Sequence, residues 1–105
     1  MTASSLGLTP EDLEALLGIL ERYVPGTEIW AFGSRIKGTA RPFSDLDLVV
    51  VNDRPLTAQA RAELNYALSE SNLPIKMDLI EWARTSPDFR DVILQNHQIL
   101  KAKAA

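Results

Sequence analysis

The chain of 105 residues contains no cysteine and a single histidine, His97. Disulfide bonds, thiol catalysis and the usual zinc sites are therefore excluded, because zinc sites are built from cysteine and histidine side chains. No apolar run approaches the ~20 residues that a membrane-spanning helix needs. The first eight residues also lack the basic charge and the apolar run of a signal peptide. We therefore expect a cytoplasmic protein with no membrane segment.

The sequence also lacks a basic run. Lysine and arginine number 11 against 14 acidic residues, which gives a net charge of −3 and a pI of about 5.0. Proteins that bind long nucleic acids usually carry a basic stripe, because neutralising phosphates supplies most of their affinity. We therefore expect no nucleic-acid partner, although a single nucleotide remains a possible ligand.

The length allows one domain, spanning residues 1–105, and leaves little chain for a separate substrate-recognition domain. A capping threonine and a proline predict a helix from Thr9-Pro10 that Pro25-Gly26 ends. Further helices are expected over 57–71 and 87–100, a short one over 35–39, and strands over 28–32, 46–51 and 75–82. The order of the main elements predicts an α/β (α+β) fold, a small mixed sheet with helices packed on it.

Two aspartates, Asp45 and Asp47, come at the start of an apolar strand. Residues two apart on a strand share a face and lie roughly 6.6 Å apart along the chain. Their carboxylates repel each other unless a cation lies between them, and hard oxygen ligands suit Mg²⁺ or Mn²⁺. The alternative is a turn aspartate beside a solvated neighbour.

A third aspartate, Asp78, interrupts an apolar strand. A lone charge inside a sheet costs several kcal/mol unless it is paired or binds a metal. If this strand lies beside the first, three carboxylates converge. The alternative is an edge-strand aspartate that faces water and pairs with Lys76.

The segment from Gly33 to Gly38 follows a predicted strand. A glycine and a serine before a short helix offer backbone N–H groups, a hydroxyl and a helix dipole to a phosphate. Arg35 and Lys37 would neutralise further phosphate charge. The alternative is an ordinary helix cap at Ser34.

Taken together, Gly33-Ser34, Gly38, Ser44-Asp45-Leu46-Asp47 and Asp78 resemble the signature of the DNA polymerase beta-like nucleotidyltransferase superfamily. The resemblance covers about residues 30–82. It implies the nucleotidyltransferase fold, an NTP such as ATP as substrate, and two Mg²⁺ (or Mn²⁺) ions. It also implies that metal binding and catalysis belong to Asp45, Asp47 and Asp78, and nucleotide binding to Gly33, Ser34, Arg35, Lys37 and Ser44.

The short length is similar to that of the minimal nucleotidyltransferases, which pair with helical HEPN proteins in toxin–antitoxin modules. This resemblance implies an antitoxin that transfers AMP to a tyrosine of its HEPN toxin, within a hetero-oligomer. Two other functions stay open: an antitoxin that acts by contact alone, and a nucleotidyltransferase for small molecules. Among the remaining residues, Trp30 and Trp82 are expected in the core or an interface on strands, His97 at the surface or half-buried on the last helix, and Glu81 in solvent.

Overall fold

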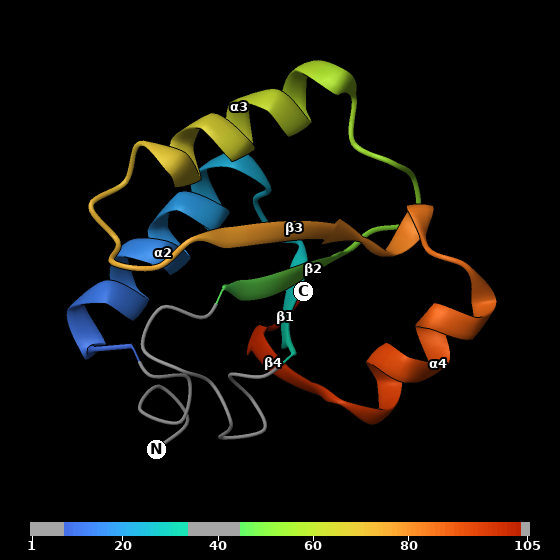
Figure 1. The fold of residues 1–105 in the computed structure, drawn as a ribbon. Helices are drawn as coiled ribbons and strands as arrows, with labels where there is room; N and C mark the ends of the chain where they lie inside the picture. The colour runs from blue at the N-terminus through green and yellow to red at the C-terminus, as the bar shows by residue number, and fades with distance from the viewer. Residues whose placement is uncertain (1–7, 34–44, 104–105) are drawn as a thin grey trace.

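Four strands form one mixed sheet in the computed structural model, which describes residues 8–33 and 45–103. They are β1 (Glu28–Phe32), β2 (Leu46–Val51), β3 (Met77–Glu81) and β4 (His97–Lys101), and their order across the sheet is β3-β2-β1-β4. β2 runs parallel to β3, whereas β1 is antiparallel to both β2 and β4. The predicted small mixed sheet, with the aspartate-bearing β2 inside it, is confirmed (Figure 1).

Each of the three α-helices in the described residues begins at a hydroxyl cap. The helices are α2 (Pro10–Tyr23), α3 (Ala58–Ser69) and α4 (Pro87–Gln95). The hydroxyl oxygens of Thr9, Thr57 and Ser86 accept hydrogen bonds from backbone N–H groups of the first turns, at 3.1, 3.0 and 3.2 Å. Such caps satisfy N–H groups that have no partner inside the helix. The predicted helix starts are therefore confirmed.

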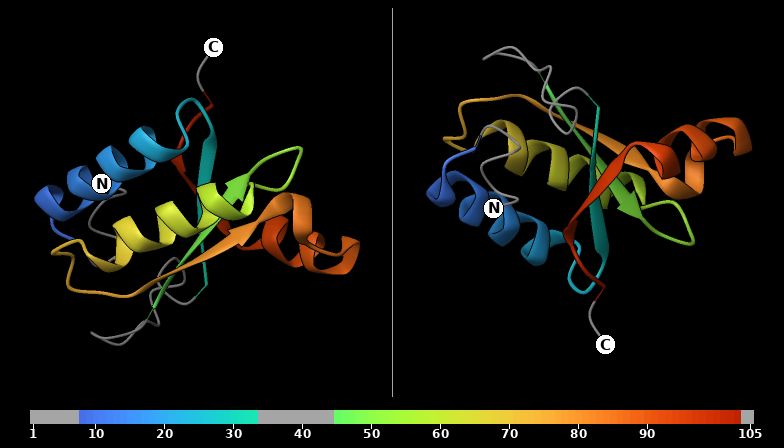
Figure 2. Two further views of the ribbon diagram at one scale, coloured as in Figure 1. Left: turned by 90° about the horizontal axis from the view of Figure 1, so that it is seen from above. Right: turned by 90° about the horizontal axis from the view of Figure 1, so that it is seen from below.

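The helices cover the two faces of the sheet unequally. Figures 1 and 2 show α2 and α3 side by side on one face and the shorter α4 on the other. The larger core lies under α2 and α3, where Leu16, Leu20, Leu48 and Leu64 are fully buried. The smaller core lies under α4 and is built on Trp30, Val49 and Ile93. None of the described helices is long and apolar enough to cross a bilayer.

The end of the chain differs from the sequence prediction. The helix predicted over 87–100 stops at Gln95, and residues 97–101 form strand β4 along the outer edge of β1. The local apolar spacing fits a helix, but an unpaired edge of β1 would leave backbone N–H and C=O groups without partners. Pairing with β1 therefore outweighs the local preference, and His97 lies on this strand instead of a helix.

Three ends of helices and strands also differ from the sequence prediction by one or two residues. Helix α3 ends at Ser69 rather than Ser71, and β3 spans 77–81 rather than 75–82. Trp82 consequently belongs to a short 3₁₀ helix, η1 (Trp82–Arg84), and not to a strand. Trp82 was expected in the core or an interface, and it is partly buried against the smaller core, edge-on to Trp30 with ring centroids 5.5 Å apart. The predicted short helix over 35–39 lies outside the described residues.

Candidate active site

The pairing of β2 with β3 brings two of the predicted aspartates together. Asp47 is the register partner of Asp78 across the parallel pair, and on its other side Asp47 is the partner of Phe32 in β1. Both aspartates are half-buried and alternate with residues of the large core, so they lie on the α4 face of the sheet. The expectation that the strand of Asp78 lies beside that of Asp47 is confirmed.

Asp45 stands immediately before β2 and is exposed. It is close enough to act on Asp47, since burial, the charge of Asp78 and the charge of Asp45 together raise the pKa of Asp47 above its ordinary value of 3.8. A raised carboxyl pKa with acidic neighbours means that the three charges repel one another. Such a cluster is typical of a site that a cation neutralises.

Gly33 makes room for this cluster at the end of β1. Its φ is +101°, a conformation that glycine adopts at little cost. A Cβ at this position would lie 2.6 Å from Oδ2 of Asp47, which is far inside van der Waals contact. Gly33 therefore ends the strand and at the same time leaves space for the Asp47 carboxylate.

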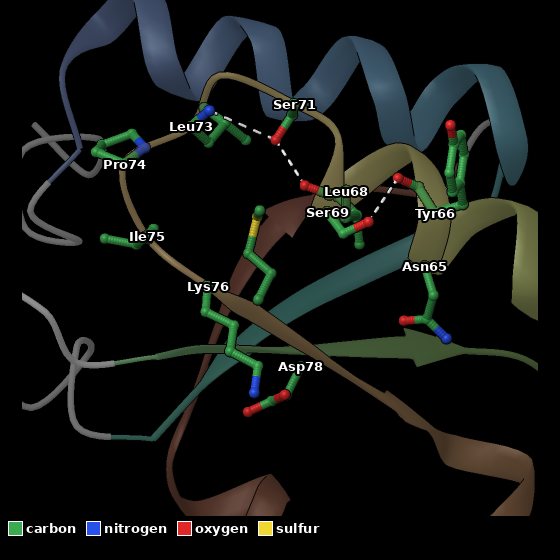
Figure 3. A pocket seen from close by; sticks show the side chains of 11 residues that line it. Asn65, Tyr66, Leu68, Ser69, Ser71, Leu73, Pro74, Ile75, Lys76 and Asp78 are labelled. Atoms are coloured by element: carbon green, nitrogen blue, oxygen red, sulfur yellow. Dashed lines mark hydrogen bonds between the residues drawn. The ribbon is translucent and has the colours of Figure 1, made fainter.

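Lys76 forms no ion pair with the third aspartate. Figure 3 shows the side chains of Lys76 and Asp78 pointing toward one another, but no ion pair joins these two described residues. β3 is an edge strand, as the alternative interpretation of Asp78 supposed. However, Asp78 is half-buried and faces Asp47, so a solvated surface charge does not describe it.

The donor set suits a hard divalent cation in residue type, register and charge. Carboxylate oxygens are the ligands that Mg²⁺ and Mn²⁺ prefer. As the side chains stand, no three acidic or histidine residues within 8–33 and 45–103 converge closely enough to hold an ion. The three-aspartate metal site thus stays a prediction, supported by the Asp47–Asp78 register and by the charge of Asp45 on Asp47.

Several predicted nucleotide-binding residues lie outside the described residues: Ser34, Arg35, Lys37 and Ser44, together with Gly38 of the motif. Of that group only Gly33 is described, and it borders the aspartate cluster. Their assignment to phosphate binding therefore stays a prediction.

Glu81 was wrongly expected in solvent. Its residue is 6% exposed, and it lies on the α2–α3 face at the end of β3. Its carboxylate pairs with Arg61 of α3 and accepts hydrogen bonds from the Leu56 N–H at 2.6 Å and from the Asn52 amide at 3.4 Å. Glu81 therefore ties the start of α3 and the loop before it to the strand that carries Asp78.

The sequence offered one signal for this network. Glu81 has the opposite strand parity to Asp78, so it had to point into the large core. A buried carboxylate needs a partner of opposite charge. The partner is Arg61, which lies a whole helix away in the sequence, and no local pattern identifies it.

A strand-end glycine beside paired aspartates, on a mixed sheet with the parallel unit β2–α3–β3, fits the class of the nucleotidyltransferases. The family model of the nucleotidyltransferase domain matches residues 13–100, and the chain belongs to this family. It is 43% identical over 100 residues to a protein of Haemophilus influenzae named probable protein adenylyltransferase MntA. That alignment covers 95% of this chain and 88% of the relative.

Solved structures agree with this assignment. A chain of a toxin–antitoxin crystal structure with AMP-PNP is 26% identical, with a TM-score of 0.73 over 87% of this chain and 73% of that one. A chain from the complex of a tri-AMPylated Shewanella oneidensis HEPN toxin with its MNT antitoxin has a TM-score of 0.67. The identity there is 23%, and the match covers 89% of this chain and 71% of that one, so it supports the fold alone.

Proposed function

We propose that this chain transfers AMP from ATP to a hydroxyl of a protein acceptor, a tyrosine of a cognate HEPN-type toxin, and thereby acts as the antitoxin. The observation that carries the proposal is the Asp47–Asp78 register, with Asp45 adding its charge to the cluster. The relative named a protein adenylyltransferase supports the reaction, and the toxin–antitoxin structure with AMP-PNP supports the adenine nucleotide. Because ATP is a cytoplasmic metabolite, the proposal places the reaction in the cytoplasm.

Different residues along the sheet have different roles in the proposed reaction. Gly33 at the end of β1, together with Ser34, Arg35, Lys37 and Ser44 of the sequence motif, binds the triphosphate. Asp78 in β3 accepts the proton of the acceptor hydroxyl. The hydroxyl oxygen then forms a bond to the α-phosphorus, the bond from that phosphorus to the bridging oxygen of the β-phosphate breaks, and pyrophosphate leaves.

Asp45, Asp47 and Asp78 would hold Mg²⁺ or Mn²⁺ ions, two in number by family resemblance. When bound, these ions neutralise the triphosphate and lower the pKa of the attacking hydroxyl. Burial and the charges of Asp78 and Asp45 raise the pKa of Asp47, and a bound cation would favour the charged carboxylate against these causes.

Charge favours a protein acceptor. A second protein that covers the site would also keep water from the reacting phosphorus. The net charge of −3 favours a protein with a basic patch over a nucleic acid. A hetero-oligomer of enzyme and toxin follows from this proposal.

The experiment is co-expression with the product of the neighbouring reading frame, followed by intact mass measurement of that partner. We expect mass gains in steps of one AMP, which disappear with Asp45→Asn and when EDTA removes divalent cations. Neutralisation of the partner by Asp45→Asn without any mass gain would instead identify an antitoxin that acts by contact. Modification of a small metabolite at full rate by the isolated chain would overturn the protein acceptor.

A further inference from the structure

A hollow of about 720 Å³ lies beside β3, at the edge of the sheet where Asp78 is found. Its walls come from the C-terminal half of α3, the segment 71–76 and the first residues of β3 (Figure 3). Asp78 completes this lining, so the hollow, which lies on the α3 side of β3, meets the carboxylate cluster on the α4 side at this one residue, around the outer edge of the strand. The site described so far makes no use of this hollow.

The sheet order assigns the hollow to one side of the reaction. In the order across the sheet, Gly33 directly follows β1, Asp47 lies in the central β2 and Asp78 lies in β3. The hollow lies beyond β3. Nucleotide phosphates at the Gly33 turn therefore lie on one side of the cluster. Attack and departure at phosphorus are in line, which puts the acceptor hydroxyl on the β3 side of the cluster. A side chain from a segment in the hollow would reach Asp78 around the outer edge of β3.

Size and lining fit a peptide segment. The volume is within the range of about 300–1,000 Å³ that is usual for ligand sites. The floor is apolar, with Leu68, Leu73 and Met77, whereas Asn65 and Ser69 bring polar groups to the rim. Tyr66 on the same rim is 68% exposed and offers an aromatic ring beside the apolar floor. Among the described strands none pairs with the outer edge of β3, so an extended segment has access.

We propose that this hollow docks the acceptor segment of the protein partner, the stretch of chain that carries the modified tyrosine, and delivers its hydroxyl to Asp78. The inference rests on the proposed function and deepens it, because it names the surface that recognises the acceptor. Nucleotide binding does not involve the hollow, so acceptor recognition and ATP affinity are separable.

The test is Asn65→Arg, which places a long side chain on the rim at an exposed position of α3. The matched control is Ala62→Arg, one turn earlier on the same helix, which is exposed, gains the same charge and lines a different hollow. With the neighbouring-frame protein as acceptor, we expect Asn65→Arg to raise KM for that protein about tenfold or more, with ATP affinity within about twofold of wild type. The control should stay within about twofold for both.

A second measurement does not depend on turnover. A benzophenone amino acid at position 65, but not at position 62, should crosslink in the absence of ATP to the partner peptide that contains the modified tyrosine. Weaker ATP binding by Asn65→Arg would show that the hollow holds the nucleotide and would overturn the inference. Equal KM values for the two arginine variants would also overturn it, whereas absence of any AMP gain with the wild-type chain would refute the proposed function itself.

Discussion

The two acidic residues of strand β3, Asp78 and Glu81, have opposite surroundings. Asp78 faces another acid, Asp47, and no ion pair joins it to the nearby Lys76. Glu81, on the other face, is buried among the donors Arg61, Leu56 N–H and Asn52. An acid whose oxygens are all satisfied stabilises the fold, whereas acids grouped without a cation store repulsion that a ligand relieves. Glu81 therefore has a structural role at the end of β3, whereas Asp78 near its start is a candidate for the chemistry.

The largest expected effect comes from Asp47→Asn. Transfer of AMP should fall by at least about 10²–10³-fold, the loss that one transition-state contact typically causes. The fold should survive, and the metal-free protein should melt at a slightly higher temperature, because a neutral amide avoids both the burial of a charge and its repulsion by Asp78 and Asp45. Activity assays and thermal melts in EDTA check both. The control, Asp53→Asn in an exposed loop, should change neither; wild-type activity that persists in EDTA would contradict the metal site.

Gly33→Ala tests whether space beside Asp47 is needed. The added Cβ would lie 2.6 Å from Oδ2 of Asp47, and the φ of +101° is unfavourable for alanine. We expect activity to fall about 10–100-fold, as small misplacements at reacting centres do, and stability to fall by about 1–3 kcal/mol. Denaturant melts and initial rates measure the two effects.

Gly18→Ala is the matched control for that substitution. Gly18 lies in helix α2, and a Cβ there meets nothing within 4 Å. The change should stabilise the protein by about 0.5–1 kcal/mol without altering activity. If the two alanine variants had the same activity and the same stability, the space that Gly33 leaves beside Asp47 would not be needed for function.

Glu81→Gln should reverse the pattern of Asp47→Asn. Removing one partner of a buried pair costs about 3–5 kcal/mol, and the cost here should be nearer 2 kcal/mol because Arg61 keeps some contact with water. Urea melts measure this loss. Glu63→Gln on the exposed face of α3 should cost less than about 0.5 kcal/mol. A larger loss of activity than of stability would show that Glu81 acts on the chemistry instead of the fold.

The smallest effect is a difference in pH dependence. Burial opposes the charge of Glu81, but hydrogen bonds from Arg61 and the Leu56 N–H outweigh it and lower the pKa of Glu81 below 4.5. Its stabilisation is therefore present above pH 4.5 and is lost as the pH falls through the lowered pKa. Asp47 behaves oppositely: its raised pKa destabilises the metal-free fold at neutral pH, and the penalty fades as the pH falls toward 3.8.

Melting curves in EDTA between about pH 3 and 7 would measure this contrast, since both carboxyl groups titrate near the acidic end. The advantage of Asp47→Asn over wild type should vanish toward low pH. The deficit of Glu81→Gln should also shrink there, because the wild type loses its ion pair. If the curves of both variants ran parallel to the wild-type curve over this pH range, the assigned environments of Asp47 and Glu81 would be contradicted.

Much of the fold could be predicted from local patterns. The caps at Thr9 and Ser86, the break at Pro25-Gly26 and the β-branched run of β2 all act within a few residues, and the structure confirms each of them. The aspartate spacing together with the glycine motif indicated the family. The predictions that were wrong concern residues whose state depends on distant partners: the strand at 97–101 needs the edge of β1, and Glu81 needs Arg61.

The sequence by itself indicated the candidate residues for the chemistry and most of the helical and extended segments, because capping, periodicity and residue type act locally. Only the tertiary structure decided which carboxylates meet. The parallel register of β2 and β3 places Asp47 beside Asp78 and turns Glu81 to the other face. The tertiary structure also placed a hollow at the outer edge of β3. Register and edge pairing are set by contacts between segments far apart in the chain, and no local pattern encodes them.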